Sequence, residues 1–427
     1  MSSLAKYASV CGYTVSGSDG VRSEQTEQLA FYGVKVRIGA EGKNEDIARA
    51  ELVVYTDAIP AEHVELSYAR ASGKRVIARA DFLRVACTNF SQVISVAGSH
   101  GKTTCTSMCA HVLKSAQVPF TAHIGGEDLT FGNFFSSGNE YFITETCEYK
   151  RNLLKMQSNT AILLNIDNDH MECYQNEQDL LSCFQSYCKQ AKTAFVCADD
   201  ERSVRLGDFP TFGLQSSLAD YRAVDLRALG EKYAFTVEEY GKPLCRIRLK
   251  AVGRHAVYNA IAAFAGMRSL GFDEKEIRIG LETFEAVKRR FEKIGTYHGA
   301  SFICDYAHHP KEVSTICATA KGLCKGKLFV VFQPHTYSRT KLLMQDFIGV
   351  LRCVDNLMVY KTYPAREKYE EEGCAKRLAQ EVGSLYCDNV YTLKTWLKKT
   401  VREGDMVLFL GAGDIYYAAQ YLLKELR

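Results

Sequence analysis

The residues Gly98–Thr104, GSHGKTT, have the types and the spacing of a phosphate-binding loop. Gly98 and Gly101 allow the backbone to pass close to an anion, so that successive N–H groups and the positive end of a following helix can surround phosphates. Lys102 adds a mobile positive charge, and the hydroxyl of Thr103 is the kind of group that ligates Mg²⁺ in such loops. These residues predict binding of a nucleoside triphosphate together with Mg²⁺.

The elements on both sides of this loop support that interpretation. The apolar residues Val93, Ile94, Val96 and Ala97 predict a buried strand at Val93–Ala97. After the loop, Met108, Val112 and Leu113 recur at roughly helical spacing. The longer form of the motif has a glycine where this chain has Val96, so an ordinary glycine turn is the alternative interpretation of the letters alone. A strand before the turn and a helix after it favour the phosphate loop.

Acidic residues and a histidine follow two further expected strands, Tyr141–Thr144 and Ala161–Leu164. The carboxyl ends of strands are where α/β sheets bind ligands. We expect Glu145 to share a Mg²⁺ with Thr103, and His170 could hold a second divalent ion, with a capping or surface role as its alternative. Glu148 and Asp167 are similarly placed, and helix capping is their alternative role.

Two groups of basic and imidazole side chains lie further along the chain. Arg289 and Arg290 could neutralise charge on a transferring phosphoryl group, or they could form a solvated basic hinge. His308, His309 and His335 lack the cysteine pair or HExxH helix of a zinc site. Binding of an organic substrate or packing at strand ends therefore fits these histidines better.

Length and composition restrict the class of protein. A chain of 427 residues exceeds one ordinary core, and its 47% hydrophobic content indicates globular domains. The net charge of only +3 argues against a nucleic-acid surface. The sixteen cysteines form no CxxC pair, and no secretory signal or membrane-length apolar run is found. We expect a soluble, cytoplasmic protein with reduced thiols, no nucleic-acid partner and no membrane partner.

The chain has three stretches of alternating helix-like and strand-like pieces, which is typical of the α/β class. The first begins in a helix, Leu4–Cys11, rather than in a strand with a glycine-rich turn, so its first strand is expected to be missing. The second contains the phosphate loop, a more antiparallel patch at Tyr233–Leu249 and a helix at Ala260–Ser269. The third predicts a second doubly wound sheet.

A series of sequence blocks in this order resembles the Mur ligase family along essentially the whole chain. The blocks are GSHGKTT at 98–104, ETCEY from Glu145, NIDNDH ending at His170, GRHAVYNAIAA from Gly253, RRFE from Arg289, DYAHHP from Asp305, FQPHTYSRT from Phe332 and GAGDI from Gly411. The resemblance implies three domains: an N-terminal Rossmann-like domain for a UDP-sugar at 1–87, here without its first strand, a central P-loop ATPase at 88–287, and a C-terminal Rossmann-like doubly wound sheet for the amino acid at 288–427.

The resemblance also implies ATP and Mg²⁺ as cofactors and assigns residues to them. ATP would be held by Gly98, Ser99, His100, Gly101, Lys102, Thr103, Thr104, Asn259 at the adenine, Arg290 at the phosphates and Asp305 at the ribose. Thr103 and Glu145 would ligate one Mg²⁺, and Glu145 with His170 a second. The implied catalytic residues are Lys102, Arg290 and His170, and the implied amino-acid site is Tyr306, His308 and Arg339.

Within the family, the blocks are most similar to those of members that join L-alanine to the lactyl carboxylate of UDP-N-acetylmuramate in peptidoglycan precursor synthesis. A carboxylate is a poor acyl donor, so phosphorylation by ATP would first give an acyl phosphate, and the amine of alanine would then displace phosphate. The alternatives are a muramate ligase that recycles a tripeptide and a truncated nucleotide-binding relative without ligase activity. We expect a monomer or a weak homodimer.

Overall fold

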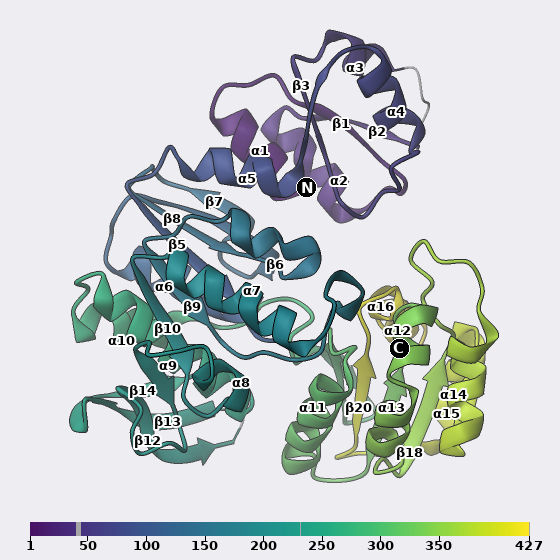
Figure 1. Ribbon diagram of the computed structural model, residues 1–427. Coiled ribbons are helices and arrows are strands. Elements are labelled where there is room, and N and C mark those ends of the chain that lie inside the picture. Colours follow the sequence, from purple (N-terminus) through teal and green to yellow (C-terminus); the bar gives the residue numbers. More distant parts are fainter. Residues whose placement is uncertain (40–43, 231, 427) are drawn as a thin grey trace. The chain divides into compact units, whose positions relative to one another are not determined.

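The computed structural model describes residues 1–39, 44–230 and 232–426 (Figure 1). Contacts divide the chain into two compact units, one of which comprises Met1–Leu226, Ala234–Leu249 and Val257–Phe284. The other comprises Arg227–Tyr233, Lys250–Ala256 and Glu285–Arg427. Both contain parallel strands that alternate with helices, as expected for the α/β class. Among the described residues, no helix combines the length and the apolar character needed to cross a lipid bilayer.

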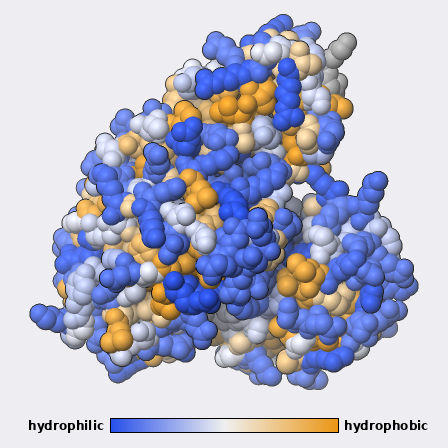
Figure 2. Space-filling view, in the orientation of Figure 1, coloured by the Kyte–Doolittle hydropathy of each residue, from blue (hydrophilic) through white to orange (hydrophobic). Residues whose placement is uncertain are grey.

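The N-terminal region of the first unit contains two separate sheets of two parallel strands each. β1 (Ser16–Asp19) pairs with β2 (Lys35–Ile38), and β3 (Leu52–Tyr55) pairs with β4 (Arg75–Ala78). No described strand joins the two pairs. Large apolar side chains are exposed here, and Figure 2 shows hydrophobic surface over this region at the top of the view. The helices are α1 (Ser2–Val10), α2 (Glu24–Gln28), η1 (Leu29–Tyr32), α3 (Glu45–Arg49), α4 (Val64–Ala71) and α5 (Arg79–Cys87).

Local propensity predicts a strand at Tyr13–Ser16, and the position of β1 shows that this prediction is wrong. The strand instead begins at Ser16 and has the sequence SGSD, which contains no residue type that favours strands. Its pairing with β2 decides its position, because Ser16–Asp19 lie opposite Lys35–Ile38 in parallel register. Long-range pairing has overridden local propensity at this point of the chain.

The middle region forms one sheet of ten strands in the order β14-β13-β12-β11-β10-β9-β5-β8-β6-β7. β5 (Gln92–Ala97) lies between β9 (Thr160–Leu163) and β8 (Tyr141–Glu145), parallel to both. Strands covered on both faces are largely apolar, which explains Val93, Ile94, Val96 and Ala97. The others are β6 (Phe120–Asp128), β7 (Gly132–Ser136), β10 (Thr193–Cys197), β11 (Thr211–Gly213), β12 (Tyr221–Leu229), β13 (Lys232–Glu239) and β14 (Lys242–Leu249).

Alternating side chains of β9 show how the two faces of this sheet are covered. Ala161 and Leu163 belong to the cluster that packs on α7 (Glu177–Gln190). Ile162 points to the opposite face, where a Cβ on Gly266 of α9 (Arg254–Ser269) would lie 2.5 Å from its Cδ1. Further helices of this region are α6 (Lys102–Ser115), α8 (Glu201–Val204), α10 (Glu274–Thr283), η2 (Tyr149–Lys155) and η3 (Met171–Cys173).

The antiparallel patch that the sequence predicted at Tyr233–Leu249 corresponds to β13 and β14. Only Tyr240 and Gly241 connect these strands, and both have positive φ, at 50° and 74°. A two-residue connection of this kind joins antiparallel strands in a hairpin.

The C-terminal region, in the second unit, has a continuous six-stranded sheet in the order β15-β16-β20-β17-β18-β19. β15 is antiparallel to β16, and the remaining pairs are parallel. The strands are β15 (Glu292–Tyr297), β16 (Ala300–Asp305), β17 (Leu328–Phe332), β18 (Asn356–Tyr360), β19 (Leu385–Cys387) and β20 (Met406–Leu410). The helices are α11 (Pro310–Leu323), α12 (Tyr337–Leu342), α13 (Met344–Leu351), η4 (Glu371–Gly373), α14 (Ala375–Val382), α15 (Val390–Thr400) and α16 (Ile415–Leu426).

Candidate active site

The phosphate loop connects the end of β5 to the start of α6, at the carboxyl edge of the middle sheet. Gly98 and Gly101 have φ values of 129° and 85°, which favour glycine. A Cβ on Gly98 would lie 3.0 Å from the carbonyl oxygen of Asn165, and a Cβ on Gly101 would lie 2.4 Å from Oδ1 of Asn259. Both positions therefore require glycine, because their φ values are positive and because residues of neighbouring segments leave no room for a Cβ.

The segment that follows β9 holds this loop in shape. The amide of His100 donates to Oδ1 of Asn165 at 2.9 Å, and Nδ2 of Asn165 donates to the carbonyl of His100 at 3.1 Å. The amide of Asp167 donates to Oγ of Ser99 at 2.8 Å, and a carboxylate oxygen of Asp167 lies 2.9 Å from Nε2 of His100. Hydrogen bonds from the segment after β9 therefore hold the loop in shape.

Lys102 forms an ion pair with Glu148. Its Nζ lies 3.3 Å from Oε2 of Glu148 and also donates to the carbonyl oxygens of Gly98 and Ser99. The Glu148 side chain is only 2% exposed. Burial would lower the pKa of Lys102, but the carboxylates around it, led by Glu148, more than offset this and raise the pKa above its usual value. The sequence indicated the place of Glu148 at a strand end but not this pairing.

Thr103 and Glu145 are brought together as the sequence predicted. The hydroxyl of Thr103 donates to Oε2 of Glu145 at 2.9 Å, while Oε1 of Glu145 is buried without a hydrogen-bond partner. Adjacent ligands of an octahedral Mg²⁺ lie about 3 Å apart, because each oxygen is 2.0–2.1 Å from the metal. This pair of hard oxygen atoms therefore fits a Mg²⁺ site.

His170 lies in a different acidic group. Ligand atoms of His170, Glu148 and Asp169 all lie within 4.8 Å of one another, and this group does not contain Glu145. His170 has a φ of 56° and contacts the ring of Tyr149 at a centroid distance of 5.1 Å. If His170 holds a second divalent ion, Glu148 and Asp169 are the carboxylates that the structure places beside it.

In the second unit, Arg289 and Arg290 lie over the ring of Tyr306, at 4.9 and 5.3 Å. Arg289 donates to the carbonyl oxygens of Gly411 and Gly413, at 3.0 and 2.9 Å, and so is an internal anchor of this unit. Asp305 is buried, and its oxygens accept from two backbone amides at 2.8 Å each. Burial raises the pKa of Asp305 to about 6, although Arg290 and those amides oppose the shift.

The three residues expected to bind the amino acid are connected through His335. The His308 ring contacts those of Tyr306 and His335, at 5.3 and 5.6 Å between centroids. Nη1 of Arg339 lies 3.4 Å from Nδ1 of His335. Burial, helped by His308 and Arg339, lowers the pKa of His335 to about 3, so its ring is neutral and accepts from the guanidinium.

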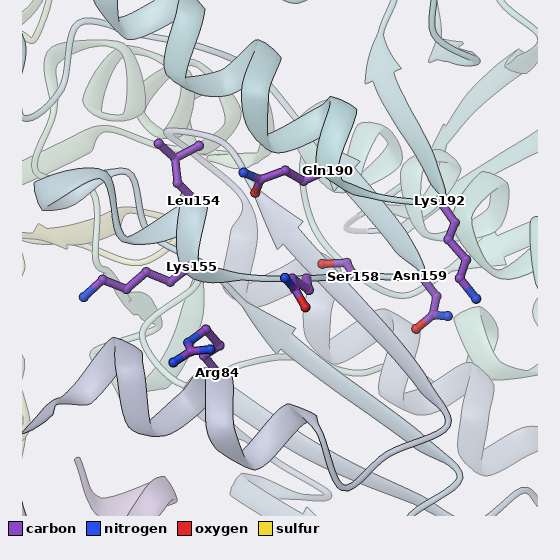
Figure 3. Close-up of a pocket in the computed structure, with 8 residues that line it drawn as sticks. Arg84, Leu154, Lys155, Ser158, Asn159, Gln190 and Lys192 are labelled. Carbon is purple, nitrogen blue, oxygen red and sulfur yellow. The ribbon is translucent and has the colours of Figure 1, made fainter.

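A hollow of about 460 Å³ lies at the opposite, amino edge of the middle sheet (Figure 3). Figure 3 shows Arg84 and Lys155 on one side of it and Lys192 on the other. Lys155 is paired with Asp81 at 3.0 Å. The hollow is separate from the phosphate loop because β9 and β10 begin here rather than end. Its lining is Arg84, Leu154, Lys155, Gln157, Ser158, Asn159, Gln190 and Lys192.

Three family descriptions match consecutive parts of this chain. They are the Mur ligase family catalytic domain at residues 1–91, the Mur ligase middle domain at 96–267 and the Mur ligase glutamate ligase domain at 289–413. The chain is 33% identical over 440 residues to the UDP-N-acetylmuramate–L-alanine ligase of Acetivibrio thermocellus, covering all of this chain and 93% of the relative. The chain belongs to the Mur ligase family. The resemblance found in the sequence is therefore confirmed.

Other relatives of this Mur ligase agree with the assignment. The UDP-N-acetylmuramate–L-alanine ligase of Lachnospira eligens is 35% identical, with 99% of this chain and 95% of the relative covered. The crystal structure of the UDP-N-acetylmuramate-alanine ligase MurC from Thermotoga maritima superimposes with a TM-score of 0.86 at 27% identity, covering all of this chain and 96% of that one. This Mur ligase has the family's three-domain α/β fold and is an ATP-dependent ligase.

A murein peptide ligase from Psychrobacter arcticus also shares the fold. Its TM-score is 0.76 at 23% identity, with all of this chain and 96% of that chain covered.

Proposed function

We propose that this Mur ligase joins L-alanine to the lactyl carboxylate of UDP-N-acetylmuramate, with ATP as the energy source and an acyl phosphate as the intermediate. The observation that carries the proposal is the full-length similarity, at 33–35% identity, to ligases named for this reaction. The fixed phosphate loop beside Thr103 and Glu145 supplies the ATP chemistry that the reaction needs. At 23% identity, the likeness to the murein peptide ligase shows a shared fold only. A tripeptide in place of L-alanine is the competing substrate.

We assign the phosphates of ATP to the backbone amides of the loop and to Lys102. Phosphate would replace the carbonyl contacts that Lys102 now makes, while Glu148 keeps its ammonium over the loop. Thr103 and Glu145 would hold Mg²⁺, which neutralises charge on the phosphates when bound. His170, Glu148 and Asp169 are the candidates for a second ion. Asn259, Arg290 and Asp305 are proposed nucleotide contacts.

In the second unit, we assign the carboxylate of L-alanine to Arg339, because a guanidinium binds a carboxylate with paired hydrogen bonds. Neutral His335 positions Arg339, and Tyr306 and His308 complete the proposed amino-acid site. We further propose functional domains at 1–87, 88–287 and 288–427, a cytoplasmic location and a monomer or weak homodimer. The sixteen cysteines, all unpaired in the structure, are compatible with a reducing compartment.

Release of phosphate from ATP tests the proposal. Release that requires both UDP-N-acetylmuramate and L-alanine supports it, release with the tripeptide in place of alanine indicates the recycling reaction, and no release overturns ligase function for this chain. Arg339→Ala should raise the KM for L-alanine far more than the KM for ATP. Arg352→Ala, which removes an exposed arginine of the same unit, is the matched control and should change neither constant.

A further inference from the structure

β6 departs from regular pairing in its second half. His123 is the last residue before the break, and Asp128 is the next one to pair with β7. The four residues Ile124–Glu127 therefore lie opposite the single residue Asn133 of the partner strand. A bulge of this kind bends a strand and changes where its residues point, and bulges are frequent beside active sites.

The bulge places the backbone of Gly125 against the carboxylate of Glu145. A Cβ on Gly125 would lie 1.5 Å from Oε1 of Glu145, 2.5 Å from its Cδ and 3.0 Å from Oε2. The first two distances are far below any van der Waals contact, so no residue with a side chain fits while the carboxylate stays in place. Oε1 is also the oxygen that is buried without a hydrogen-bond partner.

The backbone conformation of Gly125 does not itself demand glycine. Its φ lies outside the positive range that disfavours side chains, unlike those of Gly98 and Gly101. Gly125 is 20 residues from Glu145 in sequence and belongs to another strand. The missing side chain is therefore needed for the carboxylate and not for the turn of the chain.

We propose that Gly125 is a positioning residue for the metal site: its lack of a side chain allows the Glu145 carboxylate to face the Thr103 hydroxyl. This inference rests on the proposed function, in which Glu145 and Thr103 hold Mg²⁺. A methyl group at position 125 would force the carboxylate to rotate away and would break its 2.9 Å hydrogen bond to Thr103. Because the displaced group is the end of a flexible side chain, the fold can accommodate the change at little cost.

Gly125→Ala should change the Mg²⁺ dependence of the enzyme without changing its thermal stability. The melting temperature should stay close to that of the parent, while the Mg²⁺ concentration for half-maximal phosphate release should rise at least about tenfold, the usual range for lost support of a metal ligand. Gly349→Ala is the matched control, because a Cβ there meets no atom within 4 Å. An unchanged Mg²⁺ dependence of Gly125→Ala would overturn the inference.

A double-mutant cycle tests whether the effect passes through the carboxylate. In a Glu145→Ala background there is no carboxylate to displace, so Gly125→Ala should raise the Mg²⁺ requirement by no further factor. The same factor in both backgrounds would show that position 125 acts by another route and would overturn the inference.

A binding measurement distinguishes failure of this inference from failure of the proposed function. Calorimetry of Mg²⁺ binding to the protein saturated with ADP needs neither sugar nor alanine. Weaker Mg²⁺ binding by Gly125→Ala than by the parent supports the positioning role even if alanine ligation is absent. Equal Mg²⁺ binding by the two proteins overturns the role even if the parent is a fully active alanine ligase.

Discussion

The N-terminal and middle regions both alternate strands with helices, but they build different sheets. In the middle region, β5 pairs on both sides and five of its six residues are buried. In the N-terminal region, β1 is exposed throughout, β3 is only half-buried, and each strand belongs to a sheet of two. A pair of strands is marginally stable without further packing, whereas a strand inside a larger sheet is held by both neighbours.

This difference shows what a phosphate loop requires. The loop at Gly98–Thr104 follows β5, which is paired on both sides. Residues just after the adjacent β9 form hydrogen bonds to the loop. The described N-terminal residues contain no strand, glycine turn and helix that are fixed in this way. Exposed side chains such as Val21 and Phe31, at 71% and 88%, show how much apolar surface this region leaves uncovered.

The largest expected effect lies in the middle region, at Lys102. Lys102→Ala should lower the turnover of phosphate release by about a hundredfold or more, because a group that stabilises phosphate charge is lost. The melting temperature should also fall, because Glu148 becomes a buried charge without its cation. The double variant Lys102→Ala with Glu148→Gln should regain the melting temperature but not the turnover. Recovery of both would contradict the phosphate role.

The second largest expected difference is in the rates of amide hydrogen exchange of the two regions. Amides of β1 to β4 should exchange at least about a hundredfold faster than those of β5, because small sheets open locally at low free-energy cost. Mass spectrometry of peptides that span 16–38, 52–78 and 92–97 measures the rates. Equal protection of the three peptides would show that the split sheets are as stable as the continuous one.

A Val→Ala substitution should lower the free energy of unfolding more in the middle region than in the N-terminal region. Val96→Ala in β5 removes methyl groups from a site with 0% exposure and should cost about 2 kcal/mol. Val54→Ala in half-buried β3 should cost less than about 1 kcal/mol. Calorimetric melting curves compare the variants, and a larger loss for Val54→Ala would reverse the order of the two regions.

The smallest expected effect concerns His123 of β6, which contacts Arg79 of the N-terminal region. Nη2 of Arg79 donates to Nε2 of His123 at 3.2 Å, so the ring proton is on Nδ1, which donates to Thr144 at 3.0 Å. Burial, reinforced by Arg79, holds the pKa of His123 well below 6.5. The unfolded chain therefore binds more protons, and this contribution to stability is complete above about pH 6.5 and is lost as the pH falls.

His123→Gln should therefore melt with a weaker pH dependence between about pH 7 and pH 5 than the parent, with a difference of at most about 1.4 kcal/mol per pH unit. Exposed His298→Gln is the control and should follow the parent. If the stability of His123→Gln depends on pH as steeply as that of the parent, the buried His123 does not contribute to the pH dependence of folding.

Local patterns in the sequence were sufficient for much of the fold. The strands expected at Val93–Ala97, Tyr141–Thr144 and Ala161–Leu164 lie within one residue, at each end, of β5, β8 and β9. Each is a short apolar or β-branched run, which local propensity identifies. β1 was misplaced because SGSD has no such signal. α9 begins at Arg254 rather than at the predicted Ala260, and Ala256 and Val257 of its first turn are buried. The domain boundaries and the roles of the site residues stay predictions.

The sequence by itself predicted the glycine turn, the strand and helix on either side of it, and the nearness of Thr103 to Glu145, because glycine spacing and strand ends can be recognised locally. Only the tertiary structure decided that Glu148 pairs with Lys102, that His170 joins Glu148 rather than Glu145, and that Gly125 lies against the Glu145 carboxylate. These contacts depend on strand order and on a bulge in β6. They bring together residues far apart in the chain, and no periodicity in the sequence encodes such distances.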